Sequence, residues 1–130
     1  MDVRPYQPAD RAACLAFTDD PAFAQFLDGP TCPYFVMEHD AVIVGCGGYQ
    51  ITEKHATLEW GIIGSAWRKM GLGRFLLMYR LREIGKRPGI EHVLVDAPST
   101  IAPFFEKQGF KIAHTSAHRV QLSKRLVVCA

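Results

Sequence analysis

A glycine-containing loop with several positive charges lies near the middle of the chain, between a strand pattern and a helix pattern. The loop is RKMGLG, which spans Arg68, Lys69, Met70, Gly71, Leu72 and Gly73, and Arg74 follows it directly. The first N–H groups of a helix have no partner within the helix, and the helix dipole adds partial positive charge there. Because Gly71 and Gly73 carry no side chains, a phosphate can approach these N–H groups closely. The pattern predicts a phosphate or pyrophosphate site at the start of this helix.

The glycine spacing separates this loop from two common nucleotide-binding loops. A dinucleotide fingerprint needs three glycines spaced Gly-x-Gly-x-x-Gly, and only Gly71 and Gly73 fit. The Walker pattern, which ends in Gly-Lys-Ser or Gly-Lys-Thr, is absent from the sequence. The simpler alternative is a helix start at which the glycines only permit a tight turn. In a helix, Gly73 would lower stability by about 1 kcal/mol relative to alanine. A glycine kept at this cost next to three positive charges favours a ligand site over a simple turn.

The strand before the loop spans residues 56–63. Its alternation predicts Leu58, Trp60 and Ile62 on one face, with Glu59 on the other. The preceding strand, 41–51, contains several glycines, which predict a bulge or a close approach of another group to the backbone.

The helix after the loop is amphipathic and ends near Gly85. Its spacing predicts a buried face with Phe75 and Tyr79, together with Leu72 and Leu76. The basic residues Arg74, Arg80, Arg82 and Lys86 are predicted to point largely outward.

The remaining elements follow from periodicity and from turn residues. Strands are predicted at 2–6, 34–37, 92–96, 110–114 and 119–126, and helices at 22–27, at 101–108 and from Pro8 onward. The strands 34–37 and 41–51 form a hairpin, as do the last two. Strand 92–96 is expected to run parallel to 56–63, and Thr100 is expected to cap the helix 101–108.

Composition limits the class of protein. With 130 residues, 48% of them hydrophobic, the chain is long enough for one domain with its own core. A net charge of +2 is too small to indicate a nucleic-acid partner, and neither a membrane span nor a signal-peptide core is recognised. Cys14, Cys32, Cys46 and Cys129 are widely spaced, which argues against a zinc site or a disulfide framework. We therefore expect a reduced, cytoplasmic protein.

The loop and its surroundings resemble the GCN5-related N-acetyltransferase (GNAT) family, whose acetyl-CoA loop has the pattern Gln/Arg-x-x-Gly-x-Gly/Ala. The segment FFEKQGF at 104–110 is similar to a recurrent family segment that ends in Tyr-Glu-Lys-Leu-Gly-Phe. The resemblance extends over nearly the whole chain. It implies an α/β (α+β) fold in a single N-acetyltransferase domain over residues 1–130. The implied sheet is mixed, mostly antiparallel and splayed in the middle, with about six or seven strands flanked by about four helices.

The resemblance also implies an activity. An N-acetyltransferase moves an acetyl group from acetyl-CoA directly to a primary amine of a small molecule or a protein, with acetyl-CoA as cosubstrate and no metal. The implied acetyl-CoA-binding residues are Gly61, Ile62, Ile63, Arg68, Lys69, Met70, Gly71, Leu72, Gly73, Arg74, Ser99 and Phe105.

Glu59 is the predicted general base. Attack on a thioester needs a neutral amine, and an alkylamine with a pKa near 10 is mostly charged at neutral pH. A carboxylate can take the extra proton directly or through water, and many family members place a glutamate on this strand. Glu53 and His55 are weaker candidates. The alternative for Glu59 is an exposed strand residue paired with a lysine.

Phe105 departs from the family pattern, because the family usually has a tyrosine there that protonates the departing thiolate. Three explanations stay open: the thiolate leaves unassisted, another hydroxyl such as Ser99 or Tyr79 serves, or catalysis is weak. The alternative function is accordingly a CoA-binding regulatory or interaction module. A third is a protein that binds another phosphate ligand, such as ATP or NAD.

The acceptor amine is not specified by any residue. Asp19, Asp20 and Asp28 lie among aromatic residues and would suit a cationic amine, although helix caps and solvated turns explain them equally well. We expect no nucleic-acid or membrane partner. Homodimers are common among similar proteins, so the resemblance allows one.

Overall fold

The computed structural model describes residues 1–126 and contains one mixed sheet of seven strands in the order β1-β2-β3-β4-β5-β7-β6. The strands are β1 (Asp2–Pro5), β2 (Tyr34–His39), β3 (Val42–Thr52), β4 (His55–Ile63), β5 (His92–Pro98), β6 (Lys111–Ser116) and β7 (Arg119–Arg125). The helices are α1 (Arg11–Leu15), α2 (Pro21–Asp28), α3 (Leu72–Gly85) and α4 (Ala102–Lys107), with short 3-10 segments η1 (Pro8–Asp10) and η2 (Ser65–Trp67). The predicted mixed sheet and its flanking helices are confirmed. Cys129 lies outside the described residues.

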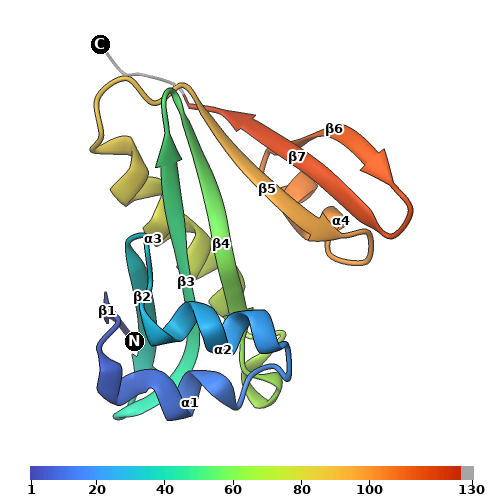
Figure 1. Cartoon of the computed structure of the whole chain (residues 1–130). Helices are drawn as coiled ribbons and strands as arrows, with labels where there is room; N and C mark the ends of the chain where they lie inside the picture. The colour runs from blue at the N-terminus through green and yellow to red at the C-terminus, as the bar shows by residue number, and fades with distance from the viewer. Residues whose placement is uncertain (127–130) are drawn as a thin grey trace.

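The sheet consists of two arms that are joined at one end. β4 and β5 pair in parallel only over His55–Thr57 and His92–Leu94, and they diverge beyond these residues (Figure 1). Every other neighbouring pair of strands is antiparallel. From Leu58 onward, β4 therefore pairs with β3 on one side and has no neighbouring strand on the other within residues 1–126. This divergence confirms the predicted splay.

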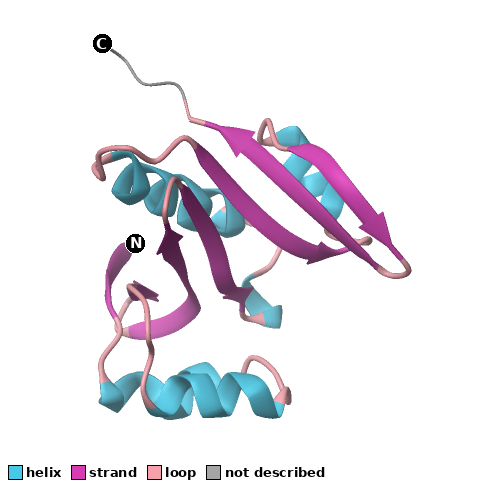
Figure 2. Cartoon of the chain, turned by 45° about the horizontal axis from the view of Figure 1, so that its top comes forward, coloured by secondary structure: helices cyan, strands magenta, loops and turns pink. Residues whose placement is uncertain are grey.

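The helices cover opposite faces of the arm that contains β2, β3 and β4. Figure 2 shows α1 and α2 on one side of this arm and α3 on the other. Phe23 and Leu27 of α2 pack with Tyr34 of β2, whereas Leu77 and Ile84 of α3 pack in the larger core cluster. α4 lies against the second arm, behind β5 and β7 (Figure 1). No helix among residues 1–126 is both long and apolar enough to cross a bilayer.

A bulge in β4 makes the predicted strand faces wrong. Gly48 lies opposite Glu59 and Cys46 lies opposite Ile62, so two steps on β3 match three steps on β4. Trp60, whose φ is 43°, is the extra residue of the bulge. As a result, Leu58 packs toward α3, while Trp60 and Ile62 both pack toward α1 and α2.

The buried face of α3 also differs from the prediction. Leu76, Leu77, Ile84 and Arg80 are buried, with Arg80 at 4% exposure, whereas Phe75 is 46% exposed. Arg80 can be buried because the glycines beneath it on β3 and β4 carry no side chains.

The predicted cap of α4 is wrong as well. Ile101, not Thr100, is the N-cap residue, and no side chain bonds to the first turn.

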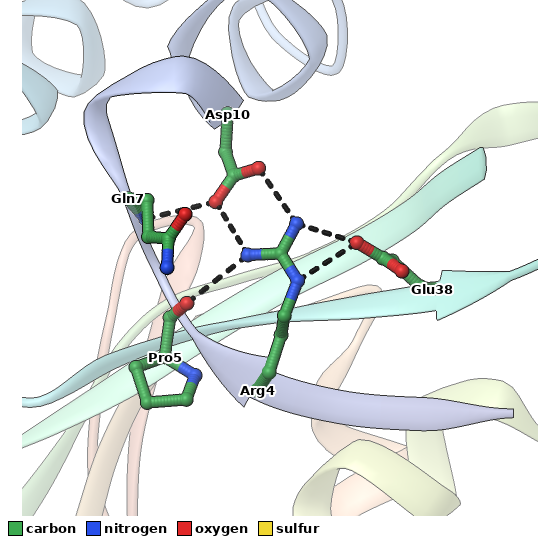
Figure 3. Close-up of polar contacts among 5 residues, drawn as sticks. All are labelled: Arg4, Pro5, Gln7, Asp10 and Glu38. Carbon is green, nitrogen blue, oxygen red and sulfur yellow. Dashed lines mark hydrogen bonds and ion pairs between the residues drawn. The ribbon is translucent and has the colours of Figure 1, made fainter. Parts of the chain in front are cut away.

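A network around Arg4 fastens the N-terminal segment to the sheet (Figure 3). The two terminal nitrogens of Arg4 each donate to one oxygen of Asp10 at 2.8 Å, and its Nε donates to Glu38 at 2.8 Å. Asp10 also accepts the Gln7 backbone N–H at 2.8 Å. Since Asp10 is 5% exposed, its carboxylate depends on these donors for the solvation it has lost.

We predict that Asp10→Asn lowers the free energy of unfolding by about 1–3 kcal/mol, because buried donors lose their charged acceptor. The Arg4 guanidinium holds the pKa of Asp10 below its usual range. The Asp10 carboxylate therefore contributes its full stabilisation above about pH 3.9, the pKa of an aspartate in the unfolded chain. This stabilisation is lost as the pH falls through the lower pKa that Asp10 has in the folded protein. Urea unfolding of the wild type and of Asp10→Asn at a series of pH values measures the difference in their free energies of unfolding. Asp19→Asn, at an exposed position, is the control, and equal losses in both variants would contradict the assignment.

Candidate active site

The loop before α3 leaves the start of that helix open. Gly71 is the N-cap residue with a φ of 79°, and no side chain bonds to the first turn. The earliest N–H at this end with a backbone acceptor in the helix is that of Phe75, which bonds to the Gly71 carbonyl oxygen at 3.1 Å. The first turn contains no acidic residue. The N–H groups before Phe75 are thus available to an anion, and the phosphate site itself stays a prediction.

The basic residues of the loop lie around this helix start. Arg68 Nε donates to the Ile63 carbonyl oxygen at 3.2 Å, and Arg74 Nε donates to Gln108 Oε1 at 3.3 Å. Lys69 is exposed, and its φ of 64° turns the backbone sharply. Met70 is 64% exposed. These contacts tie the loop both to the end of β4 and to the end of α4.

Close packing at Gly73 brings three elements together. A Cβ atom on Gly73 would lie 3.6 Å from Phe104 Cζ and 4.0 Å from Ile63. Phe104 of α4, which the sequence analysis did not single out, therefore borders the loop. Its neighbour Phe105 is buried and packs on Phe110 with ring centroids 5.4 Å apart, so its predicted contact with the thioester stays a prediction.

The bulged part of β4 provides the second half of the site. Gly61, Ile62 and Ile63 lie where β4 has lost β5 as a neighbour, and Gly61 is exposed. Tyr34 Oη donates to the Trp60 carbonyl oxygen at 2.7 Å and so fixes the bulge. An extended ligand chain with amide groups could bond to this strand edge as an added strand does.

Glu59 lies on β4 directly before the bulge and is half-buried. Burial raises the pKa of Glu59 above its ordinary value. None of the ion pairs within residues 1–126 includes it, so the alternative of a structural lysine pair has no support there. Burial and the Glu59 charge together raise the pKa of the Cys32 thiol to about 11, which indicates that Cys32 lies nearby.

The structure separates the two weaker candidates for the base from Glu59. Glu53 and His55 lie at the turn into β4, at the end where β4 and β5 are still paired. Tyr79 packs against Phe35 of β2 with ring centroids 5.2 Å apart. Ser99 is exposed, and its N–H bonds to the His118 carbonyl oxygen at 2.8 Å.

Two of the three acidic residues suggested for an acceptor, Asp20 and Asp28, have structural partners. Asp20 caps α2 by accepting the Ala22 N–H at 2.9 Å, and Asp28 pairs with Arg11 at 2.9 Å. These contacts favour the explanation that Asp20 and Asp28 serve the fold, as a helix cap and as an ion-pair partner, and not an acceptor amine. The aromatic residues nearby pack on Trp60, with Phe23 at 5.1 Å between ring centroids.

Comparisons of sequence with protein families and of fold with solved structures both find similarity to acetyltransferases. Residues 3–110 match the family described as acetyltransferase (GNAT) family. An uncharacterized protein, YyaT, of Bacillus subtilis (strain 168) is 30% identical over 82 residues, which are 63% of this chain and 55% of that protein. The match therefore spans little more than half the length of this curated relative.

Two solved structures illustrate the similarity in fold. The ribosomal-protein-S18-alanine N-acetyltransferase from Escherichia coli superposes with a TM-score of 0.81 at 17% identity, covering 99% of this chain and 96% of that one. An aminoglycoside 6'-N-acetyltransferase complexed with coenzyme A gives 0.82 at 16% identity, covering 100% and 99%. At these identities the likeness shows the fold alone.

We predict that Tyr34→Phe weakens the bulge while the rest of the core stays packed. Loss of the hydrogen bond to the Trp60 carbonyl should lower the free energy of unfolding by about 0.5–1.5 kcal/mol. Hydrogen exchange at the β4 amides from Trp60 to Ile63 should speed up more than exchange in β7. Tyr6→Phe, which removes a 3.2 Å bond to the Leu27 carbonyl, is the matched control. Unchanged β4 exchange in Tyr34→Phe would show that the hydroxyl does not hold the bulge.

Proposed function

We propose that this chain, which belongs to the acetyltransferase (GNAT) family, transfers an acetyl group from acetyl-CoA to the nitrogen of a primary amine. The observation that carries this proposal is one juxtaposition: an open helix start meets an unpaired strand edge at Gly73 and Ile63. A pyrophosphate suits the first feature, and the amide groups of a pantetheine arm suit the second. The CoA complex of the structurally similar aminoglycoside acetyltransferase supports the assignment.

The binding residues have distinct roles in this proposal. The N–H groups at the start of α3 would bind the pyrophosphate, and Arg68, Lys69 and Arg74 would add positive charge around it. The backbone of Gly61, Ile62 and Ile63 would bond to the pantetheine amides. Bound acetyl-CoA supplies an acetyl group that its thioester activates for transfer.

Glu59 would prepare the acceptor. Its carboxylate takes one proton from the ammonium form of the acceptor, directly or through water, and leaves a neutral nitrogen. The nitrogen then forms a bond to the acetyl carbon as the carbon–sulfur bond breaks, and the electron pair of that bond stays on sulfur. The acylated nitrogen releases its second proton to water, which leaves a neutral amide. Because burial raises the pKa of Glu59, its carboxylate is a stronger base than an exposed glutamate.

A second candidate function follows from Phe105. This residue has no hydroxyl to protonate the leaving thiolate, which favours a CoA-binding regulatory or interaction module if acyl transfer proves very slow. A protein that uses the loop for ATP or NAD is the third candidate. The acceptor amine and an assembly into homodimers are left open by the site.

We expect acetyl-CoA and CoA, but not ATP or NAD, to raise the melting temperature of the protein. A ligand at one hundred times its Kd stabilises by about 2.7 kcal/mol. Gly73→Val should abolish the shift, because the added methyl groups occupy the approach to the helix start.

Gly85→Val makes the same change at the other, open end of α3 and should keep the full shift. A protein that responds to ATP or NAD but to neither CoA species would contradict the proposed function.

We predict that Glu59→Gln lowers kcat/KM about 10²- to 10⁴-fold with little change in CoA affinity. In the wild type, kcat/KM should rise with pH through the raised pKa of Glu59, since only the carboxylate form accepts a proton. Thiol release across a panel of primary amines measures both. Glu53→Gln, at the far end of β4, is the control, and equal losses in both variants would rule Glu59 out as the base.

A further inference from the structure

Arg80 of α3 is a buried cation directly behind the bulge of β4. Its side chain is 4% exposed, and its guanidinium lies between the backbones of Gly47 and Gly61. A Cβ atom on Gly61 would be 2.8 Å from Nη2 and 3.1 Å from Nη1. A Cβ atom on Gly47 would be 3.2 Å from the central carbon of the guanidinium. Two glycines on neighbouring strands thus make the space that this charge occupies.

The charge of Arg80 is not neutralised by any ion pair within residues 1–126. Nη1 donates one hydrogen bond to the Gly48 carbonyl oxygen at 3.3 Å, and Nε is buried without a partner among the described residues. Tyr34 and Cys46, the titratable groups of the sheet that influence the pKa of Arg80, pack on the opposite face toward α1 and α2 and are neutral when protonated. On α3 itself, Glu83 is paired with Lys86 at 3.1 Å. Burial lowers the pKa of Arg80 only to about 10, so the group stays charged at neutral pH.

A buried charge without a counter-ion is costly, and natural proteins seldom keep one without a use for it. An apolar side chain would fill the same place against Leu76 at no such cost. The position behind Gly61 is where the proposed function places the end of the pantetheine arm. The chain also lacks a hydroxyl at Phe105.

We propose that Arg80 is a positioning residue for acyl transfer, whose fixed positive charge behind Gly61 stabilises the negative charge that develops on the thiolate of CoA as it leaves. This inference rests on the proposed function and deepens it. When the carbon–sulfur bond breaks, the electron pair stays on sulfur, and the thiolate later takes a proton from water. The cation lowers the energy of the thiolate without giving up a proton, so electrostatics replaces the missing acid.

The pKa of the CoA thiol in the binary complex tests this without knowledge of the acceptor. It is measured by the ultraviolet absorption of the thiolate during a pH titration, and the same titration with desulfo-CoA is subtracted to remove the protein thiols. In the wild type, the bound thiol should titrate about one unit or more below free CoA.

Two neutral variants separate charge from structure. Arg80→Gln is neutral and keeps a polar N–H donor on a shorter side chain, and Arg80→Met fills part of the space with an apolar chain. Both should raise the thiol pKa by about one unit relative to the wild type, while the CoA affinity measured by calorimetry changes less than threefold. Arg82→Met removes an exposed arginine from the same helix and should leave the thiol pKa unchanged.

The inference is overturned if the wild-type thiol titrates no lower than free CoA, or if Arg80→Gln keeps the wild-type value. The second result would show that Arg80 only supports the bulge. Absence of CoA binding by the wild type would instead refute the proposed function, so the two failures are distinguishable.

Discussion

The bulge at Trp60 is the constraint on which the rest of the site depends. A non-glycine residue with positive φ is unfavourable in a strand, so the surrounding contacts must hold it there. Tyr34 bonds to the Trp60 carbonyl from the side of α2, and Arg80 occupies the space behind Gly61 from the side of α3. The bulge turns β4 at the region where β5 diverges, and the strand edge between them is left free.

The site is assembled from elements that are individually unremarkable. A helix start, a strand end and α4 meet at Gly73, where an added Cβ atom would lie within van der Waals contact of Phe104 and Ile63. The helix start contributes N–H groups without a partner in the helix, and β4 beyond Thr57 has an edge that faces no other strand within residues 1–126. Under the proposed function, binding would therefore depend more on backbone geometry than on reactive side chains, with Glu59 as the exception.

Periodicity in the sequence was sufficient for the order of strands and helices, the hairpins, the parallel pair and the helix that follows the glycine loop. It failed where one residue changed the register, because the alternation that put Leu58 and Trp60 on one face assumed a regular strand. It failed again at Arg80, since a charged residue is normally an exposed one. The glycines of β3 predicted a close approach to the backbone, but no local pattern showed that an arginine from α3 would be the approaching group.

The limited pairing of β4 with β5 also bears on solubility. An exposed sheet edge is a template onto which another protein can add strands, and natural proteins generally cover or interrupt such edges. Here the unpaired part of β4 faces inward between two diverging arms, with β5 joined to it over only three residue pairs. A single extended chain suits this position, whereas a twisted sheet from a second molecule would meet both arms. The same geometry that leaves this edge of β4 unpaired thus protects it from edge-to-edge aggregation.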